Sequence, residues 1–187
     1  MFTDSKETLM KSLRFVGVAL LFMAPFALAQ TSALNSATLD FEGIGPVRVG
    51  MNLSQASAAA KVQIKSEGAG PHSECEYAAP VSGPGGVGFT IVNQRIADIT
   101  VREGHFATSA GIRVGDLESK VVDTYKGKAQ FVGRKAVDSP RRLKLMTKSV
   151  TGDNMEMTFI AYGGKITMIV AGRPVSDVPG KGCRLKN

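Results

Sequence analysis

Six segments of the chain combine apolar and polar residues in the way that β-strands do, and they fall into two groups of three. The first group covers 75–78, 86–92 and 95–101, and the second covers 143–148, 155–162 and 165–171. Asn93-Gln94 separates the last two segments of the first group, and Gly163-Gly164 does so in the second. Two-residue loops of this kind are typical of β-hairpins. The pattern therefore predicts two antiparallel units of three strands each.

A segment with helical features precedes each group of strands. Asn52 can cap a helix over 53–62, and Gln55 can reach back to the cap, which together make a capping box. The aligned position before the second helix is Leu117, whose side chain cannot cap. We therefore expect Asp116 to accept backbone N–H bonds one residue earlier.

Parts of these two halves also match in sequence. Residues 46–50 (PVRVG) recur as 111–115 (GIRVG) at a spacing of 65, and 89–99 matches 159–169 at a spacing of 70. Two matches in the same order indicate one duplicated unit.

The duplication and the element pattern together predict the fold class. We expect an α+β fold of two tandem helix-plus-antiparallel-sheet repeats, with helices on one face of a sheet. The first repeat covers 41–104 and the second covers 108–183, and the small polar residues of 30–40 form a flexible leader.

The first thirty residues have the features of a secretory signal. A basic segment at 10–14 precedes an apolar run at 15–26, and Ala27-Leu28-Ala29 supplies small residues for cleavage. We predict a signal peptide over 1–29, with translation starting at Met10; an extended start segment from Met1 is the alternative. The apolar run is too short for a membrane span. The mature protein is expected to be periplasmic or secreted, without a membrane span.

Charge and cysteine content refine this expectation. The formal net charge of +7 falls to +6 after cleavage, because residues 1–29 carry three basic and two acidic side chains. Such a charge favours anionic surfaces or acidic proteins as partners. Cys75 and Cys183 are the two cysteines of the chain, and an oxidising compartment favours a disulfide between them. Two unpaired, buried thiols are the alternative.

A short motif in each half resembles a known family. Val49-Gly50-Met51-Asn52-Leu53 with Ala56, and Val114-Gly115-Asp116-Leu117 with Val121, resemble the glycine, polar cap and apolar helix residue of the β-lactamase-inhibitor-protein-like fold. This group includes the SmpA/OmlA assembly lipoproteins. The resemblance implies tandem helix-then-sheet repeats. Members of the group inhibit enzymes, support envelope assembly or have no known role, so the resemblance does not select an activity.

Motifs for catalysis and cofactor binding are weak. Residues 83–88 (GPGGVG) fit G-x-G-x-x-G, but a strand follows them, whereas a dinucleotide site requires a helix there. His72 and His105 have no metal-ligand pattern nearby. The chain lacks a nucleophile motif such as G-x-S-x-G. We predict no enzyme, no cofactor and no metal; a composite catalytic site built by the fold is the alternative.

The strongest candidate for partner binding is a basic stretch in the second half of the chain. If 142–148 is a strand, Arg142, Lys144 and Lys148 share one face while Leu143 and Leu145 share the other. The stretch comprises Arg134, Lys135, Arg141, Arg142, Lys144 and Lys148. It could hold an acidic protein or an anionic envelope polymer. The alternative is a solvated edge strand whose charges prevent aggregation.

The sequence thus favours an exported binding protein, or an inhibitor, of an acidic macromolecule. A structural envelope component without a discrete ligand is the second hypothesis, and a small hydrolase is the third. Nucleic acid is not expected as a partner, because the protein is exported and its basic residues are not interleaved with aromatic ones.

Overall fold

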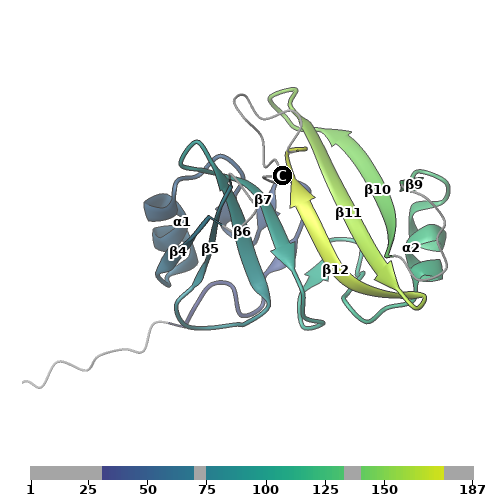
Figure 1. Cartoon of the computed structure of the whole chain (residues 1–187), viewed down its shortest axis with the longest axis horizontal. Helices are drawn as coiled ribbons and strands as arrows, with labels where there is room; N and C mark the ends of the chain where they lie inside the picture. Colours follow the sequence, from purple (N-terminus) through teal and green to yellow (C-terminus); the bar gives the residue numbers. More distant parts are fainter. Residues whose placement is uncertain (1–30, 70–74, 133–139, 175–187) are drawn as a thin grey trace, which may run out of the picture.

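The computed structural model describes residues 31–69, 75–132 and 140–174, which form two β-sheets and two short helices (Figure 1). The larger sheet has eight strands, in the order β4-β5-β6-β7-β12-β11-β10-β9. Every neighbouring pair in it is antiparallel. In this order, the strands are β4 (Ile64–Ala69), β5 (Glu76–Pro80), β6 (Val87–Val92), β7 (Arg95–Val101), β12 (Lys165–Gly172), β11 (Asn154–Tyr162), β10 (Arg141–Lys148) and β9 (Gln130–Val132).

The smaller sheet consists of four two-residue strands in the order β3-β2-β1-β8. They are β3 (Val47–Arg48), β2 (Gly43–Ile44), β1 (Thr38–Leu39) and β8 (Ala107–Thr108). β1 pairs with β8 in parallel, so this sheet joins the start of the described chain to its middle.

The two helices lie near opposite ends of the large sheet, α1 (Leu53–Ala60) beside β4 and α2 (Glu118–Tyr125) beside β9 and β10 (Figure 1). The predicted capping box of α1 is confirmed, because Asn52 Oδ1 accepts from the Gln55 amide and Gln55 Oε1 accepts from the Asn52 amide. The predicted cap of α2 is wrong. Leu117 is the N-cap residue and provides no side-chain bond, while Asp116 accepts from the Arg113 amide and from Lys120 Nζ.

One face of the large sheet carries the core. Leu143, Phe159, Ile169, Val101 and Val87 lie side by side on five successive strands, and each is at most 5% exposed. Both helices and the small sheet contribute to the same apolar cluster. The opposite face, which we call the outer face, carries the alternating residues of the same strands.

The predicted hairpins are confirmed. Asn93 and Gln94 have φ of 50° and 62°, and Gly163 and Gly164 have 58° and 77°, so both loops have the positive φ pair of a tight hairpin. The six predicted strands are present as β5, β6, β7, β10, β11 and β12, with ends shifted by at most two residues.

The predicted fold class is wrong. The described residues form a β-rich fold with a four-stranded and an eight-stranded sheet, and not two helix-plus-sheet repeats. The helices are only eight residues long, and short strands replace expected loops. Above all, β7 pairs with β12 through four residue pairs, so strands from both halves form one sheet over a shared core.

The flexible leader is also wrong for its described part, because Leu34 and Leu39 are fully buried and β1 is a strand. The predicted boundaries at 41–104 and 108–183 stay a prediction. Neither helix in the described ranges is long and apolar enough to cross a membrane.

Candidate functional site

The predicted alternation along β10 is confirmed. Leu143 and Leu145 are buried in the core, and Arg142 and Lys144 lie on the outer face with Lys148. Arg134 and Lys135 lie outside the described residues.

Most of the described cations of this stretch already have partners. Lys144 Nζ forms a 2.7 Å ion pair with Glu156 of β11, and Lys148 Nζ donates to Asn154 Oδ1 at 2.5 Å. Arg141 lies on the core side, where its guanidinium forms a 2.9 Å ion pair with Glu118 and lies 4.6 Å from the Phe131 ring centre. Within the described part of the chain, Arg142 is therefore the cation of β10 without a side-chain partner.

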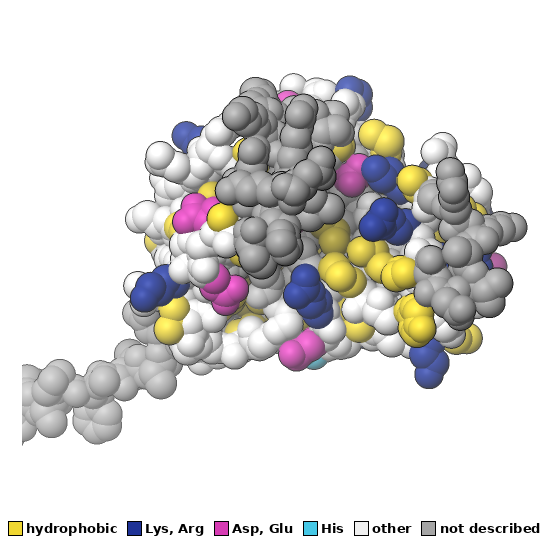
Figure 2. All heavy atoms as spheres, viewed as in Figure 1, with side chains coloured by type: hydrophobic (Ala, Val, Ile, Leu, Met, Phe, Trp, Pro, Cys, Tyr) yellow, Lys and Arg dark blue, Asp and Glu magenta, His cyan; other side chains and the backbone are white. Residues whose placement is uncertain are grey.

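Apolar side chains lie beside these cations on the outer face. Ile160 pairs with Arg142 across β10 and β11, and Met168 continues this row on β12. Val170 occupies the next row, and all three apolar residues are half-buried, whereas Met146 of β10 is 60% exposed. Figure 2 shows hydrophobic and Lys or Arg side chains next to each other over this half of the sheet. We call Arg142, Lys144, Met146, Ile160, Met168 and Val170 the mixed patch.

A buried carboxyl group lies farther along the same face. Asp98 of β7 is 6% exposed and accepts a 2.8 Å hydrogen bond from Thr90 of β6. Gly172 lies between Asp98 and Glu156 in the same row of the sheet. The pKa of Asp98 is raised to about 6: burial is the largest cause, the Thr90 hydrogen bond opposes it, and the nearby Glu156 carboxylate adds to the increase. Sequence reasoning missed Asp98, although a lone acid between Ala97 and Ile99 in an apolar strand was a visible signal.

The hydroxyl of Thr158 is a second buried polar group on this face. Thr158 is 7% exposed, and no residue in the described ranges hydrogen-bonds its Oγ1. It pairs with Lys144 on β10 and with Val170 on β12, so it lies within the mixed patch.

The other sequence candidates gain little from the structure. His105 contacts Glu103 at 3.4 Å, and the described residues contain no cluster of three or more His, Cys, Asp or Glu side chains that could hold a metal. The strand expected after the glycine-rich segment is β6. Cys75 is 1% exposed and packs with Val92 and Ala97. Cys183 and His72 lie outside the described residues, so the disulfide stays a prediction.

Comparison with known proteins shows little similarity. No family model and no curated protein matches the chain. A crystal structure of the uncharacterized protein yfeY from Escherichia coli is similar over 73% of this chain and 99% of that one, with 14% identity and a TM-score of 0.46. A likeness of this size carries no functional argument.

Proposed function

We propose that the protein is an exported binding protein whose mixed patch binds an acidic protein. The observation that carries the proposal is Arg142, an exposed cation without a side-chain partner in the described chain, next to half-buried Ile160. Protein interfaces combine an apolar centre with polar groups at the rim, and arginine and methionine are enriched in them. Arg142 and Met146 supply those residue types here.

The mixture of groups favours a protein over an anionic polymer as the partner. A polymer of phosphates or carboxylates would be held by cations alone. Lys144 and Lys148 already interact with Glu156 and Asn154, which weakens a purely ionic site. Apolar side chains between the charges suit a folded acidic surface with apolar groups of its own.

Export is part of the same proposal. It rests on the basic, apolar and small-residue order of 10–29. We further propose that the binding role is non-catalytic, because the chain lacks the common nucleophile motifs. The resemblance to the β-lactamase-inhibitor-protein-like group rests on the motifs at Gly50 and Gly115, and inhibition of the partner is one form that the role could take.

Charge reversal at Arg142 tests the proposal. We expect the wild-type protein to capture a partner from cell-envelope extract, and Arg142→Glu to lose it, because a like charge would face the acidic surface. Captured partner should decrease as salt is raised. Cross-linking followed by mass spectrometry should place the partner next to β10, β11 and β12.

Lys65→Glu is the matched control, because Lys65 is an exposed lysine of β4, which lies at the opposite edge of the large sheet from β9 and β10. It makes the same change in net charge and should keep the partner. Equal capture by both variants, or cross-links elsewhere, would contradict the proposal. Retention of purified anionic polymer, with no captured protein, would favour the polymer instead.

A further inference from the structure

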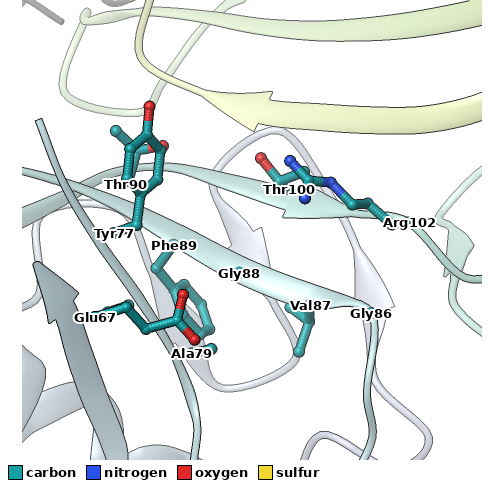
Figure 3. Close-up of a pocket in the computed structure, with 11 residues that line it drawn as sticks. Glu67, Tyr77, Ala79, Gly86, Val87, Gly88, Phe89, Thr90, Thr100 and Arg102 are labelled. Carbon is teal, nitrogen blue, oxygen red and sulfur yellow. The ribbon is translucent and has the colours of Figure 1, made fainter. Parts of the chain in front are cut away.

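The outer face is hollowed over β5, β6 and β7, in the half of the sheet away from the mixed patch (Figure 3). The hollow has a volume of about 460 Å³, which lies within the usual range of small-molecule sites. Its lining includes Glu67, Tyr77, Gly88, Thr90, Thr100 and Arg102. Tyr77 is paired with Thr90, and Gly88 with Thr100, which places all four on one face.

Gly88 has no evident structural need to be glycine. Its φ lies outside the left-handed region, and an added Cβ would approach only the Ala78 carbonyl oxygen, at an ordinary 3.7 Å. Nearby Gly86 differs, with φ of +75° and a Cβ position only 2.4 Å from Glu103 Cγ. A glycine inside a strand weakens the strand and often marks a site where a ligand approaches closely. The missing side chain of Gly88 keeps the floor of the hollow open.

Two side chains of opposite charge lie in the hollow, one on each side of Gly88. Glu67 comes from β4, Arg102 directly follows β7, and Gly88 lies between them (Figure 3). Both side chains are exposed, and neither forms an ion pair or side-chain hydrogen bond with another described residue. β4, which carries Glu67, and β7, which Arg102 follows, are three strand spacings apart, so their backbones are separated by about 14 Å. Because both side chains are long, a ligand of a few residues could reach both charges.

Thr90 adds a directional group to the hollow. Its hydroxyl donates to Asp98 Oδ1, so the Thr90 oxygen is left to accept a hydrogen bond. A ligand N–H would satisfy it. Tyr77, which is 41% exposed, supplies a partly apolar wall beside it.

We propose that the hollow binds a short zwitterionic peptide of about two to four residues, with its carboxylate at Arg102 and its ammonium group at Glu67. A carboxylated sugar would satisfy Arg102 but would leave Glu67 without a cation. The site goes beyond the proposed binding of an acidic protein, because it uses other strands and other residues. The two proposals can therefore fail independently.

NMR titration of the ¹⁵N-labelled protein with trialanine tests the site. We expect saturable shifts of the Gly86, Gly88 and Thr90 amides at millimolar peptide or below. Trialanine acetylated at its N-terminus and amidated at its C-terminus should bind at least about tenfold more weakly, because it lacks both charges. Equal binding of the capped peptide, or no shift at these amides, would overturn the proposal.

Three variants and two controls locate the binding. Gly88→Val should abolish the shifts by filling the floor, while Arg102→Gln and Glu67→Gln should each weaken binding about tenfold. Lys128→Gln and Asp123→Asn remove exposed charges at or after α2 and should bind as the wild type does. Gly88→Ala is the second floor variant if the valine protein does not fold. Unchanged binding by the folded floor variant, or tighter binding of glucuronate than of trialanine, would overturn the peptide assignment.

Discussion

The carboxyl group of Asp98 is almost completely buried and has little contact with water. It faces Thr90 on β6 and the Glu156 carboxylate on β11, and Glu156 is itself paired with Lys144. The strand between them contributes Gly172, which has no side chain. Burial is therefore the main reason that the pKa of Asp98, at about 6, lies above the ordinary value of 3.8.

The raised pKa makes stability depend on pH. Between the unfolded and the folded pKa, the folded state binds more protons, so the free energy of unfolding falls as pH rises from about 4 to above 6. Asp98→Asn keeps an acceptor for Thr90 and removes the charge. We expect this variant to match the wild type near pH 4 and to exceed it by about 3 kcal/mol at pH 8.

Urea unfolding of both proteins across this pH range measures the difference. Comparing the two proteins cancels most contributions of the other titrating groups. Asp123→Asn, on the exposed side of α2, should show no such divergence. A constant difference between Asp98→Asn and wild type would contradict a raised pKa.

At the scale of elements, the two helices are capped differently. α1 has a complete capping box, whereas α2 begins at Leu117 without a side-chain bond. Asn52→Ala should lower the free energy of unfolding by about 1 kcal/mol, because the Gln55 amide loses its partner.

Leu117→Asn should raise the free energy of unfolding by about 0.5–1 kcal/mol, because Leu117 has extended backbone geometry and is 57% exposed. Thermal unfolding measures both, and a loss with Leu117→Asn would show that its apolar contacts outweigh a cap.

The junction between β7 and β12 depends on Gly172. Its φ is +150°, and an added Cβ would lie 2.4 Å from the Ala97 carbonyl oxygen and 2.6 Å from Asp98 Cα. Gly172→Ala must move the strands apart, so we expect a loss of at least about 2 kcal/mol in urea unfolding. Gly88→Ala is the matched strand control and should change stability by less than about 1 kcal/mol. Equal effects of the two substitutions would show that the junction tolerates displacement.

Local features of the fold were predictable from the sequence, because each depends on neighbouring residues. The Asn93-Gln94 hairpin and the Asn52 capping box are of this kind. The two matched glycine turns also behave alike, since Gly50 and Gly115 both donate to a strand residue of the large sheet, Ile96 and Ile166 respectively. Sequence matches of this kind indicate shared local contacts, but they do not show how distant strands assemble into a sheet.

At the scale of the whole molecule, the sequence prediction failed where distant segments meet. The pairing of β7 with β12 and the parallel pairing of β1 with β8 join segments about 70 residues apart in the chain. The burial of Leu34 is a tertiary effect that local composition does not reveal. In the candidate site, alternation correctly placed Arg142, but Asp98 and the hollow over Gly88 depend on neighbouring strands.

The predicted disulfide between Cys75 and Cys183 would act on the whole molecule. Cys75 is buried with Val92 and Ala97, so solvent reductant would reach it poorly in the folded protein. Closing a loop of more than 100 residues stabilises the folded state by about 4–5 kcal/mol in the chain-entropy estimate, because it restricts the unfolded chain. Non-reducing peptide mapping of the exported protein should yield one linked peptide pair. Reduction should then lower the melting temperature, and Cys183→Ser should lower it similarly without any response to reductant. Two thiols open to alkylation in the unfolded, non-reduced protein would refute the bond and would leave the stability of the fold to its shared apolar core.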